Sequence, residues 1–192
     1  MYECLLFFVN LTIMKKYFQF NGTINGTTFL LRSLFSIVLS IPLFIVMIAF
    51  AAIVGFELLD TAGIDISEIQ ETGTFDQTEL EEKIEEKFKD NPEELVSLVK
   101  NAFTPFWIIG IILTIIPVIW FGLATYYKRV SALFYENRLN VFFGLLIFEI
   151  TSDIVIFKFD NWLDTVFMIG SILVFLFMLI KDSGIQAEDH EG

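Results

Sequence analysis

The sequence predicts an all-α integral membrane protein with four transmembrane helices and a short two-helix insert outside the cytoplasm. Two observations lead to this fold class. The chain of 192 residues is 55% apolar and has a mean hydropathy of +0.68, yet its net charge is −12. Apolar and charged residues must therefore occupy different parts of the chain, and long uncharged runs do alternate with one strongly acidic stretch.

The same composition excludes several classes of protein. The apolar fraction is too high for a disordered chain, and the single cysteine, Cys4, excludes a disulfide scaffold. A net charge of −12 argues against a nucleic-acid partner, which needs a basic surface. With one histidine, His190, and no glycine-rich phosphate loop, we expect no enzyme activity, cofactor or metal. A lipid-modifying enzyme is the weaker alternative.

Residues 1–28 are predicted to form a cytoplasmic N-terminal segment. The apolar stretch at 4–14 is too short to cross a membrane, and it precedes Lys15 and Lys16, whereas a signal peptide has its charges first. Met14 resembles a natural start, so residues 1–13 are either a spurious upstream extension or a short interfacial segment. Both alternatives stay open at this point.

Two uncharged runs are long enough to cross a membrane. They cover residues 33–56 and 101–127 and contain 24 and 27 residues. A helix needs roughly 20 residues to cross the hydrocarbon core. We therefore predict transmembrane helices at 29–56 and 105–127.

Two further apolar runs contain acidic residues and are also interpreted as spans. The run that ends at Ile180 is interrupted only by Asp164, which predicts a helix at 162–180. The run at 139–157 contains Glu149 and Asp153. We include it because a topology with three spans is harder to orient.

Residues 57–104 form an acidic loop between the first two spans. This loop has 14 acidic residues and four lysines, which leaves a net charge of −10. Thr78 and Glu81 match a capping box, and Pro92 follows a capping residue, so we predict two short amphipathic helices here. The acidic residues lack the order of a calcium loop, which favours a solvated cap over a metal site.

The positions of lysine and arginine predict the orientation of the chain. Seven of these 12 residues lie before or at the start of the first span, in the loop at 128–138, or in the tail at 181–192. The other five lie in the acidic loop or in the short loop at 158–161. By the positive-inside rule, both termini are expected in the cytoplasm and the acidic loop outside.

Glu149 is predicted to lie near the middle of the membrane. At about 1.5 Å per residue, it is roughly 16 Å of helix from Arg138 and roughly 14 Å from Lys158. Asp153 lies one turn further along on the same face. An acid at this depth should face the bundle and find a partner there.

Polar residues at similar depth in the other spans are Ser40, Thr114 and Ser171. Together with Glu149 and Asp153 they predict an intramembrane polar site. One interpretation is a proton- or cation-responsive site or a small-ligand pocket. Another is a hydrogen-bonded packing device, which we favour, and a third is a span shifted so that Glu149 nears an interface.

Two segments match motifs of a known family. Residues 18–29 resemble an aromatic-x-F-x-G-R-x-x-R-x-x-[FW] entry to a first span, and residues 127–133 resemble an R-R-L-H-D segment after a second span. The chain thus resembles the bacterial inner-membrane family called domain of unknown function 805. The matching positions are Phe20, Gly22, Phe29, Lys128 and Arg129.

The departures from these motifs limit what the resemblance implies. Thr23 and Gly26 replace the first motif's arginines, and Ser131 and Ala132 replace the His-Asp pair, so no role of that pair transfers. The family has no assigned activity. The resemblance implies only a four-span architecture and a location in the bacterial inner (plasma) membrane.

Two functional hypotheses follow. The leading one is a non-enzymatic accessory or scaffold component that contacts the lipid bilayer and either another membrane protein or a second copy of the chain. The alternative is a small transporter or channel-like protein that uses the polar site around Glu149. Unchanged behaviour across pH in Glu149→Gln would remove the ion-coupling hypothesis.

Overall fold

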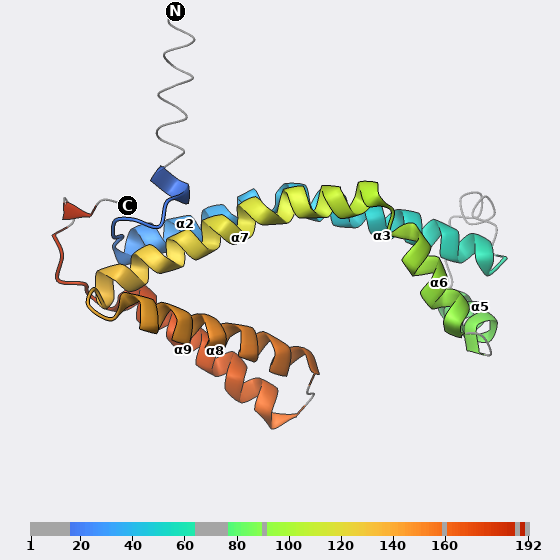
Figure 1. Ribbon diagram of the computed structural model, residues 1–192. Coiled ribbons are helices and arrows are strands. Elements are labelled where there is room, and N and C mark those ends of the chain that lie inside the picture. The colour runs from blue at the N-terminus through green and yellow to red at the C-terminus, as the bar shows by residue number, and fades with distance from the viewer. Residues whose placement is uncertain (1–15, 64–76, 90–91, 159–160, 187–188, 191–192) are drawn as a thin grey trace, which may run out of the picture. The chain divides into compact units, whose positions relative to one another are not determined.

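The computed structural model describes residues 16–63, 77–89, 92–158, 161–186 and 189–190 (Figure 1). No strand occurs among these residues. Four helical segments are long and apolar enough to cross a membrane, namely Gly26–Thr61, Pro105–Leu133, Arg138–Lys158 and Trp162–Ile180. The predicted all-α membrane class with four spans is therefore confirmed. The expectations for residues 1–13 and Cys4 lie outside the described residues.

The chain divides into two compact units. The first unit comprises residues 1–39 and 117–192, and the second comprises residues 40–116. A proline lies at or near each border between the units. Pro42, in the first turn of a helix, follows the border at 39–40, and Pro117, inside another helix, follows the border at 116–117. Proline has no backbone N–H and weakens the helical hydrogen-bond ladder. The first predicted span is accordingly two helices, α2 (Gly26–Leu39) and α3 (Ile41–Thr61).

The second unit contains the acidic part of the chain. It consists of α3, α5 (Gln77–Lys89), α6 (Pro92–Ala102) and the first part of α7 (Pro105–Leu133). α6 packs on α3 and α5 packs on α6. The Phe50 ring anchors this packing, with its centroid 4.5 Å from that of Phe103 and 5.5 Å from that of Trp107. The two short helices predicted in the acidic loop correspond to α5 and α6.

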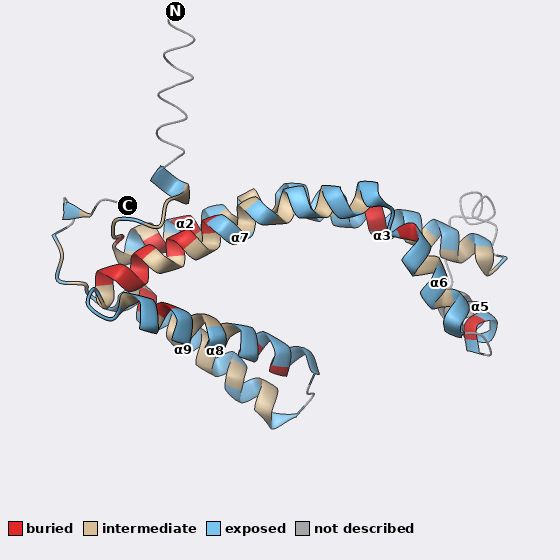
Figure 2. Cartoon of the chain, in the orientation of Figure 1, coloured by how far each residue is buried: buried red, intermediate tan, exposed pale blue. Residues whose placement is uncertain are grey.

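The first unit contains α2, the rest of α7, α8 (Arg138–Lys158) and α9 (Trp162–Ile180). α9 packs along α8 and also contacts α2. The buried residues of α7 concentrate toward its C-terminal end (Figure 2). The buried core cluster of this unit is Ile24, Phe29, Val130, Phe142 and Met178.

Most apolar surface of the spans is not covered by protein. Only 6% to 11% of the most apolar window of each span is buried. A soluble protein does not leave apolar faces of this extent in water, whereas lipid tails cover them at no cost. The bilayer is therefore a contact partner of all four spans.

Candidate functional site

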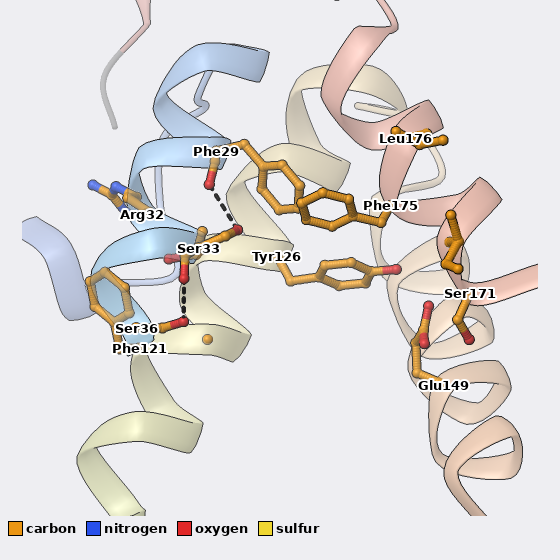
Figure 3. A pocket seen from close by; sticks show the side chains of 13 residues that line it. Phe29, Arg32, Ser33, Ser36, Phe121, Tyr126, Glu149, Ser171, Phe175 and Leu176 are labelled. Carbon is orange, nitrogen blue, oxygen red and sulfur yellow. Dashed lines mark hydrogen bonds between the residues drawn. The ribbon is translucent and has the colours of Figure 1, made fainter. Parts of the chain in front are cut away.

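A cavity of about 470 Å³ lies between the helices of the first unit. We call it the Glu149 cavity. Four helices line it, with Ser33 and Ser36 from α2, Tyr126 from α7, Glu149 from α8 and Ser171 from α9. The Tyr126 hydroxyl, the Glu149 carboxylate and the Ser171 hydroxyl point toward one another (Figure 3). Polar groups from three separate helices thus converge on one apolar-walled space.

The hydroxyls on α2 are already used within their own helix. Ser33 Oγ donates to the Phe29 carbonyl at 2.9 Å, and Ser36 Oγ donates to the Ser33 carbonyl at 2.6 Å. Back-bonding of this kind is how serine hides its donor in a helix surrounded by lipid. The α2 side of the cavity therefore presents oxygen lone pairs but no free hydroxyl donor.

The opposite side carries hydroxyls that have no partner. Tyr126 Oη, Ser171 Oγ and Thr125 Oγ1 are buried and make no hydrogen bond with any described residue. Leaving a buried hydroxyl unpaired costs about 1–3 kcal/mol. Three such groups at one cavity indicate a space that holds water, an ion or a small ligand.

The structure brings together two of the five residues predicted to form a polar site. Glu149 and Ser171 line the cavity, whereas Asp153 is exposed on α8 and does not. Ser40 and Thr114 belong to the second unit. Thr114 Oγ1 donates to the carbonyls of its own helix, at 2.9 and 3.0 Å, so it is occupied locally.

Tyr126 and Thr125 are functional candidates that the sequence does not predict. Both stand beside the predicted end of the second span, at position 127, where an aromatic residue is expected at the lipid–water interface. The signal that could have found them is the Thr-Tyr-Tyr run directly before Lys128 and Arg129. In the structure α7 continues to Leu133, so all four residues lie within the helix.

α7 extends to Leu133, through part of the region predicted as a loop at 128–138, and Arg129 lies in this extension. Its side chain is 1% exposed, and its guanidinium donates to the carbonyls of Ile24, at 3.1 Å, and of Met178 and Lys181. α9 ends at Ile180, and carbonyls at a helix end lack partners within the helix. Arg129 therefore caps the C-terminus of α9 and ties it to the segment before α2.

Gly26 completes this junction by allowing two backbones to meet. A Cβ atom at this position would lie 2.0 Å from the Leu179 carbonyl oxygen. Only glycine fits against another backbone at this distance. The first turn of α2 and the last turn of α9 are thus in direct contact, and the Arg129 Nη2 atom would lie 3.5 Å from the same Cβ.

The positions that carry the family resemblance all take part in local packing. The Phe20 ring lies 5.2 Å from the Trp120 ring and 5.8 Å from the Tyr127 ring. Gly22 has a φ of 79°, in the left-handed region that favours glycine. Phe29 is in the core, and Lys128 and Arg129 are buried. Packing and backbone conformation account for the residue types at these five positions, so no catalytic role is needed to explain them.

No group of three or more His, Cys, Asp or Glu side chains that could hold a metal occurs in the described part of the chain. No family model, curated protein or solved structure matches the chain. The function is therefore inferred from the cavity itself.

Proposed function

We propose that this chain is a small, non-enzymatic transporter or channel-like membrane protein that binds a monovalent cation, a proton or an alkali ion, in the Glu149 cavity. One observation carries the proposal. The Glu149 carboxylate shares the cavity with three buried hydroxyls that have no partner among the described residues. Hydroxyl and carboxylate oxygens are the ligands that hard cations prefer.

The charge of the site favours a monovalent ion over a divalent one. Glu149 is the one carboxylate lining the described cavity, so it balances a single positive charge. Arg32 also lines this cavity, but its guanidinium points away from Glu149 (Figure 3). A carboxylate in an apolar surrounding is costly, and a bound cation offsets that cost.

The accessory or scaffold function remains a second hypothesis. Exposed apolar faces on the spans serve lipid as well as a protein partner, so they do not favour it over transport. We further propose that the protein is a divergent member of the family named above, in a bacterial inner membrane with both termini in the cytoplasm. The motif matches and the distribution of lysine and arginine support that proposal.

Ion flux in proteoliposomes tests the proposed function. Wild-type protein and Glu149→Gln are reconstituted at equal density, and the decay of an imposed proton or sodium gradient is followed with an entrapped dye. Glutamine keeps the shape of the side chain and removes its charge. Losing about 1.4 kcal/mol of cation binding lowers flux by about tenfold.

Asp153→Asn is the matched control. It removes one carboxylate from the same helix, one turn away, at an exposed position outside the cavity. We expect its flux to equal that of the wild type. Equal flux in Glu149→Gln and wild type, or no flux above that of protein-free liposomes, would overturn the proposal. A protein partner reproducibly crosslinked in native membranes would then favour the scaffold hypothesis.

A further inference from the structure

A second cavity of about 470 Å³ lies beside Arg32 in the first unit. We call it the Arg32 cavity. Residues Tyr17 and Phe18, which precede α2, form one wall, and Leu31 and Phe35 of α2 form another. Phe121 of α7 also lines it, and its ring centroid lies 5.6 Å from that of Phe35. The lining is aromatic and aliphatic except at Arg32 and one threonine.

Arg32 is buried without a hydrogen-bond acceptor. The residue is 4% exposed, and none of its three guanidinium nitrogens has a partner among the described residues. Its Cζ atom lies 4.8 Å from the centroid of the Tyr17 ring. A buried guanidinium with no acceptor is costly, which indicates that an anion outside the described residues supplies the acceptor.

The surrounding charges also favour an anion. Two further cations lie near Arg32, because its guanidinium lies over Tyr17, which directly follows Lys16, and Lys128 on α7 contacts Lys16. The ammonium of Lys128 donates to the Lys16 carbonyl at 2.7 Å, a contact that leaves its positive charge in place. Glu149 faces Tyr126 and Ser171 instead of Arg32 (Figure 3). Three cations are thus gathered at this end of α2, and their repulsion would be relieved by a bound anion.

The apolar residues that line the Arg32 cavity favour an amphiphile over a free anion. Leu31 is 61% exposed and Phe35 is 51% exposed, so an inorganic anion bound at Arg32 would leave this apolar surface uncovered. Arg32 lies six residues after the start of α2, or about 9 Å along the helix. With the start of α2 at the membrane surface, this is the depth at which a lipid headgroup passes into its acyl chains.

We propose that the Arg32 cavity binds an anionic phospholipid. Its phosphate accepts hydrogen bonds from the Arg32 guanidinium, and an acyl chain lies along Leu31 and Phe35. Arginine suits this role because its planar donors match two phosphate oxygens at once. Arg32 and Phe121 line both cavities, but the phosphate site excludes Glu149 and its test does not depend on ion flux.

Lipid binding to the purified protein tests this inference. Retention of phosphatidylglycerol and of phosphatidylcholine is measured by native mass spectrometry as each lipid is titrated into the detergent. Wild type should prefer phosphatidylglycerol. Arg32→Gln should lose that preference, with phosphatidylglycerol binding about tenfold weaker, because one charge-assisted contact to phosphate is removed.

Arg138→Gln is the matched control. Arg138 also lies over a tyrosine ring, with its Cζ atom 4.8 Å from the Tyr135 centroid, but it lines neither cavity. It should bind phosphatidylglycerol as the wild type does. Equal binding by Arg32→Gln and Arg138→Gln would mean that Arg32 only packs on Tyr17, and would overturn the proposal.

Two further measurements distinguish a phospholipid from free phosphate as the ligand of the Arg32 cavity. Inorganic phosphate at millimolar concentration should not displace phosphatidylglycerol, and displacement would assign the site to a free anion instead. Leu31→Ser changes an exposed residue, so it should fold even if Arg32→Gln does not. It should weaken binding of long-chain phosphatidylglycerol more than that of a short-chain form, and equal effects would contradict the acyl-chain placement.

Discussion

Two buried arginines in the same unit make opposite use of their surroundings. Arg129, on α7, is 1% exposed and donates to three backbone carbonyls, two of them at the end of α9. Arg32, on α2, is 4% exposed and donates to no described residue. The first guanidinium is satisfied by backbone carbonyls of the chain, whereas the second has no acceptor among the described residues. The buried charge of Arg129 therefore holds a structural junction together, whereas the buried charge of Arg32 belongs to the proposed binding site.

The difference arises from what each helix end offers. The last turn of α9 has carbonyls without helical partners, and an arginine from α7 reaches them. Arg32 donates to no helix C-terminus among the described residues, and its guanidinium lies over the aromatic face of Tyr17. Substitutions that remove one or the other charge should therefore act on different properties.

The largest effect is expected for Arg129→Gln. It leaves carbonyls of three residues at the junction without their charged donor, which we expect to lower the free energy of unfolding by about 3 kcal/mol or more. In a chain of this size that corresponds to a drop in apparent Tm on the order of 6–12 °C. Thermal unfolding in detergent, followed by tryptophan fluorescence, measures it. Arg138→Gln is the control. An apparent Tm of Arg129→Gln equal to that of the control would contradict a stabilising role of Arg129 at the end of α9.

A smaller effect is expected for Gly26→Ala. The added Cβ would lie 2.0 Å from the Leu179 carbonyl oxygen, so α2 or α9 must shift, and we expect a loss of about 1–3 kcal/mol. Gly144→Ala is the matched control, because a Cβ there meets nothing within 4 Å. The control should equal or slightly exceed the wild type in apparent Tm. Equal apparent Tm in both variants would mean that the two backbones are not in contact.

The fold was predictable because it depends on composition along the chain. A span must satisfy its backbone internally, so a long uncharged run can hardly be anything but a helix. The break at Ser40 is harder to predict, although Pro42 is visible in the sequence. Proline is tolerated within many membrane helices, so its presence does not say whether one helix or two will form.

The sequence predicts how deep the candidate site residues lie in the membrane, but it does not predict the direction in which their side chains point. Glu149 and Ser171 could be found because their distance from the span ends gives their depth. Which residues face each other depends on helix rotation, so Asp153 was expected beside Glu149 but lies exposed. The acceptors of Arg129 are 49, 52 and 105 residues away in sequence, and no local pattern reports a contact at such distance.

The smallest effect on stability is expected for Arg32→Met, and it separates the two arginines most sharply. Methionine keeps much of the apolar stem and removes a guanidinium that has no described acceptor. Replacing an unpaired buried charge by an apolar side chain is neutral or stabilising, so in neutral detergent the free energy of unfolding should stay within about 1 kcal/mol of wild type. Phosphatidylglycerol should then raise the apparent Tm of the wild type and of Arg129→Gln, because a ligand stabilises the state that binds it.

That lipid-dependent rise should vanish in Arg32→Met. A rise equal to that of the wild type would place the lipid elsewhere. A large loss of stability in neutral detergent would show that Arg32, like Arg129, holds the fold together. Either result would remove the contrast between the two regions.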